Sequence, residues 1–77
     1  MKVSRRYYAN VRKGVWYVAN VTCADLISGT CQQWFLVISR VGSDGSSRTV
    51  FNESFDSLYH AENARRKWKK GLKWTAI

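Results

Sequence analysis

Alternating apolar and polar residues predict a β-hairpin in the first third of the chain. The alternation covers residues 5–23 and is interrupted at Lys13-Gly14, which is a turn signal. Tyr8 and Trp16 fall on the more polar faces of the two strands, and we expect both rings to point outward. The more apolar face of the second strand is assigned to the core and comprises Val15, Tyr17, Ala19, Val21 and Cys23.

The middle of the chain predicts a loop followed by a second hairpin. Residues 24–30 form the loop, with Ser28-Gly29 as its turn. A strand follows over residues 32–41, and its long apolar centre is typical of a central strand, either covered on both faces or rich in exposed rings. The Gly/Ser/Asp-rich residues 42–47 then lead into a strand over residues 48–55. The inward face of this strand is expected to carry Phe51 and Phe55.

The last third predicts one amphipathic helix. Asp56 or Ser57 is a suitable N-cap, and no helix breaker follows until Gly71, which favours the left-handed C-terminal position. Apolar residues three and four apart form a single stripe, with Trp68 as its main core contact. The stripe comprises Leu58, Ala61, Ala64 or Arg65, Trp68 and Leu72. Residues 72–77 either fray or add a short strand at a sheet edge.

These elements together predict an α+β domain that spans residues 1–77. Its antiparallel sheet is expected to have three or four strands, built from two hairpins, with one C-terminal helix packed on one face. Eleven large aromatic residues in a chain of 77 supply the core and make disorder unexpected. Because a sheet this small has open edges, we expect either a monomer or an edge-paired homodimer.

Charge adds a functional expectation to this fold. Thirteen Lys and Arg residues oppose five Asp and Glu residues, which gives a formal net charge of +8. Residues 63–77 contain no acid, although like charges three or four positions apart repel on a helix. A surface of this kind favours an anionic partner, either nucleic acid or the acidic surface of a host protein.

Two basic clusters and three aromatic rings are the candidate binding residues. If the fold brings the two clusters to the same side, they form one groove for phosphates, and binding will depend steeply on salt. Exposed rings between basic residues would stack on unpaired bases. The basic candidates are Arg5, Arg6, Arg12, Lys13, Arg66, Lys67, Lys69, Lys70 and Lys73. The candidate stacking or anchor rings are Tyr8, Trp16 and Trp74.

The residues that could support catalysis or metal binding are sparse. Cys23 and Cys31 are eight positions apart, which is not zinc spacing, and His60 is the only histidine. The two cysteines either close a disulfide across the base of the 24–30 loop or stay as thiols in a reducing compartment. We therefore expect a non-enzymatic protein with no metal and no cofactor. The sequence shows no leader and no apolar run of about 20 residues, so we expect a cytoplasmic protein without a membrane partner.

The order of these elements is similar to that of two groups of phage proteins. Antiparallel strands followed by one helix with basic ends resemble the small arm-type DNA-binding domains of phage integrases, and also small anti-CRISPR proteins. The resemblance lies in architecture and size, and it implies a nucleic-acid-binding module from a phage or mobile element. The alternative is a phage-type inhibitor that blocks a host nucleic-acid-handling protein. A ribosome-associated or structural accessory protein is a third hypothesis.

Overall fold

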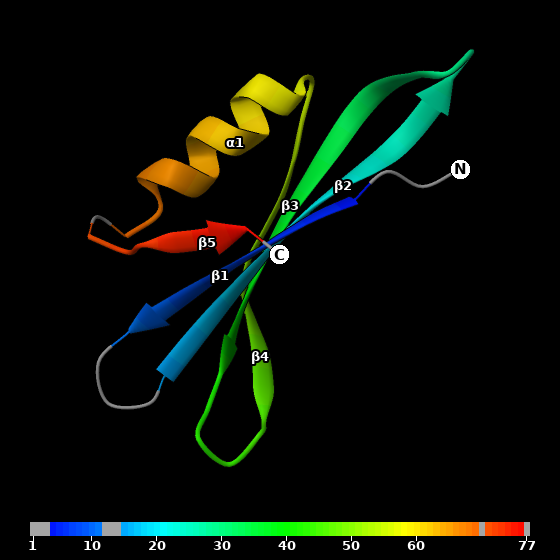
Figure 1. Ribbon diagram of the computed structural model, residues 1–77. Coiled ribbons are helices and arrows are strands. Elements are labelled where there is room, and N and C mark those ends of the chain that lie inside the picture. The colour runs from blue at the N-terminus through cyan, green and yellow to red at the C-terminus, as the bar shows by residue number, and fades with distance from the viewer. Residues whose placement is uncertain (1–3, 12–14, 70, 77) are drawn as a thin grey trace.

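The protein folds as a five-stranded antiparallel sheet with one helix (Figure 1). The computed structural model describes residues 4–11, 15–69 and 71–76. Along the sheet the strands follow the order β4-β3-β2-β1-β5. The elements are β1 (Ser4–Val11), β2 (Val15–Ile27), β3 (Thr30–Val41), β4 (Ser47–Phe55), α1 (Leu58–Lys67) and β5 (Trp74–Ala76).

Helix α1 covers one face of the sheet, and the core lies between the two (Figure 1). We call the covered side of the sheet the helix-side face and the other side the open face. The assignment of the β2 core face is confirmed, since Ala19 and Val21 are fully buried there. The buried core comprises Ala9, Tyr17, Ala19, Val21, Cys23, Trp34, Leu36, Ile38 and Ala61. Ala61 lets the helix axis approach the sheet closely, and Phe51 and Phe55 pack against this core as predicted.

The predicted α+β class is confirmed, but the strand count and the place of the helix are not exact. The sheet has five strands because the C-terminal residues pair with β1, where Tyr7 lies opposite Ala76 and Ala9 opposite Trp74. The helix is therefore followed by an edge strand and is not the last element. With a length of ten residues, α1 is also too short and too polar to cross a membrane, and no other helix occurs in the described ranges.

The helix begins where the sequence predicts and ends earlier. Ser57 is the N-cap, and its side chain accepts a hydrogen bond from the backbone N–H of His60 at 3.2 Å. The helix ends at Lys67 rather than near Gly71, because Trp68 turns into extended backbone and packs edge-on against Tyr17 with ring centroids 5.0 Å apart. Gly71 has the positive φ expected of it, at 92°, but as part of the connection to β5.

The predicted loop over residues 24–30 is wrong, because β2 and β3 continue through it as a two-stranded arm. Residues 24–33, which we call the β-arm, project beyond the sheet (Figure 1). In the described part of the chain β1 reaches only Thr22 of β2, and β4 reaches only Trp34 of β3. Ser28 and Gly29 close the arm with φ values of 52° and 80°, as a tight two-residue hairpin turn requires.

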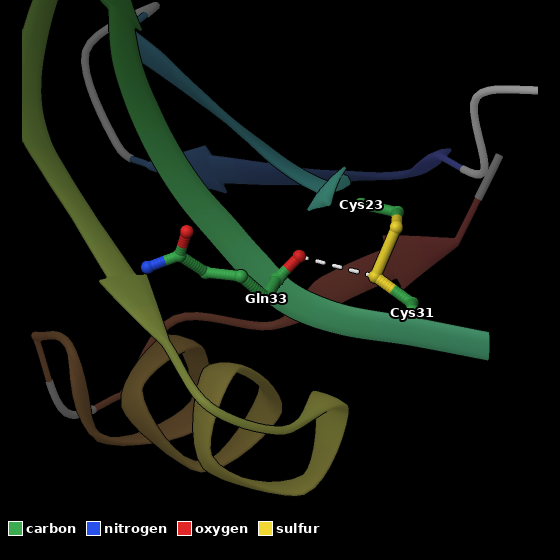
Figure 2. Close-up of a disulfide and its surroundings, with 3 residues drawn as sticks. All are labelled: Cys23, Cys31 and Gln33. Atoms are coloured by element: carbon green, nitrogen blue, oxygen red, sulfur yellow. Dashed lines mark hydrogen bonds between the residues drawn. A yellow bond between two sulfur atoms is a disulfide. The ribbon is translucent and has the colours of Figure 1, made fainter. Parts of the chain in front are cut away.

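A disulfide fastens the base of the β-arm. Cys23 and Cys31 are bonded across the two strands, with their Cα atoms 5.9 Å apart (Figure 2). Sγ of Cys31 lies 3.1 Å from the carbonyl oxygen of Gln33. A sulfur atom in a disulfide has no proton to donate, so this contact becomes a hydrogen bond only when Cys31 is a thiol. Of the two states left open by the sequence, the structure has the bonded one.

A polar contact joins α1 to the first strand. The Tyr7 hydroxyl donates to Oε2 of Glu62 at 2.6 Å, and Nε of Arg65 donates to Oε1 of the same carboxylate at 3.2 Å. The Arg65 guanidinium also lies 4.1 Å from the centroid of the Tyr7 ring. Helix α1 lies nearest to β3, β4 and β2, and these three side chains connect it to β1 as well.

The Tyr7 contact predicts a loss of stability in alkali. Burial, followed by the hydrogen bond to Glu62, raises the pKa of Tyr7 above its ordinary value of 10.0. The folded protein therefore keeps this proton to higher pH than the unfolded chain, so the stabilisation is complete below about pH 9 and falls as the pH rises above 10. Tyr7→Phe should lower the free energy of unfolding by about 1 kcal/mol at pH 7 and flatten this decline. Urea unfolding between pH 7 and 11 measures both effects.

Tyr59→Phe is the matched control, because Tyr59 is exposed on α1. It should leave the stability at pH 7 and its alkaline decline unchanged. If Tyr7→Phe and wild type lose stability with the same slope above pH 10, the contact with Glu62 does not carry the effect.

Candidate functional site

Tyr8 and Trp16 lie exposed on the open face, as the alternation predicts. Tyr8 is 37% exposed and Trp16 is 43% exposed. They stand on neighbouring strands, where Tyr8 pairs with Val18 and Trp16 pairs with Val41. A hollow of about 230 Å³ lies between them and is lined by Tyr8, Trp16, Val18 and Val41. No charged side chain among the described residues lines this hollow, so this part of it presents an apolar surface with two rings at its border.

Polar side chains continue the open face from this hollow. Arg6 lies two residues before Tyr8 on β1 and is exposed, with Asn20 directly opposite it on β2. The Asn20 side-chain oxygen accepts a hydrogen bond from the Thr22 hydroxyl at 3.0 Å, which fixes the orientation of the amide. An arginine and an oriented amide next to exposed rings can donate to phosphate oxygens or base edges.

Trp74 is half-buried and does not share the open face with Tyr8 and Trp16. It lies opposite Ala9, on the helix-side face, and packs against the core. Its Nε1 is buried and has no hydrogen-bond partner among the described residues. The Arg65 guanidinium lies 5.9 Å from the Trp74 ring, which closes that side of the indole. The face of Trp74 depends on the pairing of β5 with β1, which the local sequence pattern does not contain.

The basic residues near the end of α1 divide into exposed and tethered ones. Arg66 and Lys67 are exposed in the last turn, where Arg66 donates to Oδ1 of Asn63, and Lys73 is exposed before β5. Lys69 lies beyond the end of the helix and is exposed. Its Nζ donates to the Tyr17 hydroxyl at 3.1 Å and lies 5.6 Å from the Trp68 ring centroid. Lys70 lies outside the described residues.

That the two predicted basic clusters form one groove stays a prediction, because Arg12, Lys13 and Lys70 lie outside the described residues. Arg5 and Arg6 are consecutive on β1, so they point to opposite faces of the sheet. Arg6 shares the open face with Tyr8, whereas α1 and the residues that follow it lie over the helix-side face. A hollow of about 460 Å³ at the β1–β5 edge is lined by Ser4, Arg5, Arg6, Tyr7 and Ala76. Arg12 and Lys13 fall outside the described residues.

Two arginines that were not among the candidates come together on the helix-side face. Arg40 of β3 lies directly opposite Arg48 of β4, and Tyr17 of β2 lies opposite Arg40 on its other side. The residues appear isolated in the sequence, eight positions apart. The predicted turn over residues 42–47 would have placed Arg40 opposite Thr49, because residues equidistant from a hairpin turn face each other. In the structure β4 begins one residue earlier, at Ser47, and this register places Arg48 opposite Arg40.

The groups that catalysis or metal binding would need are engaged or scattered. Both cysteines are in the disulfide, and Nδ1 of the exposed His60 lies 2.8 Å from the Ser57 hydroxyl oxygen. Within the described ranges, no three His, Cys, Asp or Glu side chains gather in a way that would hold a metal ion. The part of the open face around Tyr8 and Trp16 is the candidate site. Comparison with protein-family models, with curated proteins and with solved structures gives no match for this chain.

Proposed function

We propose that this protein is a non-enzymatic nucleic-acid-binding module that contacts its ligand through the open face. The observation that carries the proposal is the pair of exposed rings, Tyr8 and Trp16, on the side of the sheet that no helix covers. Each ring that stacks on an unpaired base contributes about 1–3 kcal/mol to binding. Such stacking tolerates any base, so the module would bind with little sequence preference.

The charge of the chain supports this proposal. Its net charge of +8 attracts a phosphate backbone at long range, and Arg6 sits on the same face as the rings. The exposed Arg66, Lys67 and Lys73 add to the attraction from the helix-side face. In this proposal the rings contact the bases, and the basic residues account for most of the salt dependence of binding.

Fluorescence anisotropy of labelled oligonucleotides tests the proposal. Wild-type protein should bind in the micromolar range or tighter near 150 mM salt, and Tyr8→Ala and Trp16→Ala should each weaken binding by about 5- to 100-fold. Tyr59→Ala removes a more exposed ring, 68% exposed, from α1 and serves as the control, with binding unchanged. Ring variants that bind as tightly as wild type would contradict the proposed role of the open face.

The apolar lining of the hollow favours a second candidate function. Because its described lining is uncharged, the hollow between Tyr8 and Trp16 also suits an apolar side chain of a protein partner. In this case the protein is a small phage-type inhibitor, similar in kind to anti-CRISPR proteins, that docks on a host nucleic-acid-handling protein. Oligonucleotide binding that disappears near 150 mM salt, together with capture of one host protein that Trp16→Ala abolishes, would support the inhibitor.

A further inference from the structure

Three positive charges form a row across the helix-side face near the β3–β4 turn. Arg40 and Arg48 are directly opposite each other, and Tyr17 occupies the next place in the row on β2. The Lys69 ammonium donates to the Tyr17 hydroxyl at 3.1 Å, so it extends the row by one more charge. Like charges directly opposite one another destabilise an antiparallel pair, and this arrangement therefore carries a cost.

No acidic side chain offsets this cost in the described part of the chain. All five acids are described, and the ion pair that they form is Glu62 with Arg65. Asp44 is the acid of the β3–β4 turn, and its Oδ1 accepts hydrogen bonds from the backbone N–H and the hydroxyl of Ser46 at 3.0 and 2.7 Å. Its carboxylate is thus engaged within the turn, and these hydrogen bonds hold its pKa below the ordinary value.

A hollow of suitable size separates the two arginines from the turn. It measures about 250 Å³ and is lined by Arg40, Gly42, Ser46, Ser47 and Arg48. One water molecule occupies about 30 Å³ in the liquid, so the hollow has room for a phosphate group and several waters. Two guanidinium groups offer planar pairs of N–H donors that match phosphate oxygens.

We propose that Arg40 and Arg48 form a clamp for a backbone phosphate of single-stranded nucleic acid. The phosphate supplies the counter-charge that the pair lacks, with the Lys69 ammonium alongside. This inference rests on the proposed function for the identity of the ligand, but the clamp itself rests on the register, the charges and the hollow. It adds Arg40 and Arg48 to the binding residues.

The position of the clamp relative to Trp16 selects a single strand. The Trp16–Val41 and Tyr17–Arg40 pairs are consecutive rows of the sheet, about 3.3 Å apart along the strand, but they point to opposite faces. Arg48 lies on the edge strand β4, so a ligand that contacts both sites must bend sharply around the border of the sheet, and the β4 edge offers one such path. A flexible single strand can bend this sharply, whereas duplex DNA is stiff over about 150 base pairs.

Thermal unfolding with inorganic phosphate tests the clamp without any nucleic acid. In dilute chloride buffer, Arg40→Gln and Arg48→Gln should each raise the melting temperature by about 2–4 °C, because each removes the repulsion. Replacing chloride by millimolar phosphate at equal ionic strength should raise the melting temperature of wild type and not of these variants. Tyr59→Phe changes an exposed α1 side chain outside both proposed sites and should keep the phosphate response, which corrects for general salt effects.

Oligonucleotide anisotropy then tests the identity of the ligand. Wild type should bind a single strand at least tenfold more tightly than a duplex of the same length. The double variant Arg40→Gln/Arg48→Gln should lose much of this preference, and its salt slope should fall by about 0.7 for each arginine removed.

Failure of the clamp and failure of the proposed function give different results. Melting temperatures that respond to phosphate equally in wild type and the Arg40 and Arg48 variants would overturn the clamp, even if Tyr8 and Trp16 prove essential for oligonucleotide binding. A phosphate response that the variants lose, in a protein that binds no oligonucleotide, would overturn the nucleic-acid assignment. Equal binding of single strand and duplex would overturn the path around the β4 edge.

Discussion

Leu36→Ala is expected to lower the free energy of unfolding by about 3 kcal/mol, which makes it one of the most damaging single changes in this chain. Leu36 is fully buried on the helix-side face of β3, a strand with a neighbour on each side. Truncation removes the transfer free energy of the side chain and leaves a cavity that the sheet and helix fill only in part. For a domain of this size the melting temperature should fall by about 12–24 °C, as calorimetry or circular dichroism would show.

Phe35→Ala is the matched control for this prediction. Phe35 is the preceding residue on the same strand but points to the open face, where it is 40% exposed. Although phenylalanine is larger than leucine, its loss should cost less than about 1 kcal/mol, because much of its surface is already in water. Equal losses for the two variants would contradict an uncovered open face and would indicate that another molecule buries Phe35 in solution.

Removal of the disulfide is expected to cost about 2–3 kcal/mol. The bond between Cys23 and Cys31 closes a short loop, and the cost is the chain entropy that the unfolded state regains when the loop opens. Reduction also frees the Cys31 thiol to donate to the Gln33 carbonyl oxygen 3.1 Å away, which offsets a small part of the loss. Urea unfolding of wild type with and without a reductant, and of Cys23→Ser/Cys31→Ser, measures the difference.

The double serine variant separates the bond from other effects of the reductant. Reduced wild type and the variant should unfold at similar urea concentrations, both below oxidised wild type, and the reductant should leave the variant unchanged. A reductant that fails to shift wild type would show that the thiols are unpaired in solution. That result would agree with the reducing cytoplasm expected from the sequence, where disulfides seldom persist.

The faces of the strands could be predicted from the sequence because alternation is a local property. Ala19 and Val21 occupy odd positions of β2, whereas Trp16 occupies an even one. This alternation decides which side chains face the helix. The helix stripe through Ala61 follows from local spacing in the same way, and Ser57 caps the helix as its side chain predicts.

The failures all arise from contacts between distant residues. Ser28-Gly29 has the composition of a loop, and only the extended pairing on either side shows that it is the tip of an arm. The helix ends at Lys67 because Trp68 contacts Tyr17, although no breaker precedes Gly71. Trp74 lies on the helix-side face because the three residues of β5 form a strand only beside β1, and the local sequence does not specify this pairing.

One part of the candidate site could likewise be predicted from local sequence, and the other part depends on contacts between distant residues. Tyr8 and Trp16 could be predicted as exposed rings from parity alone, and the structure shows that they share one hollow. The pairing of Arg40 with Arg48 needs the register of a hairpin, and the approach of Lys69 to this row needs the path of the chain after the helix. A search for basic residues that are close together in the sequence finds neither of these contacts.

The pairing of β1 with β5 has a consequence for the order in which the protein folds. The other described pairings join strands that follow one another in the chain. The pairing of Tyr7 with Ala76 instead joins residues that are separated by almost the entire length of the chain. Closing so long a loop is entropically slow, so the β1–β4 meander should form first and β5 should dock last. Lys69 lies on the connection between α1 and β5, so its contact with the Tyr17 hydroxyl should form after the Arg40–Arg48 pair of the meander.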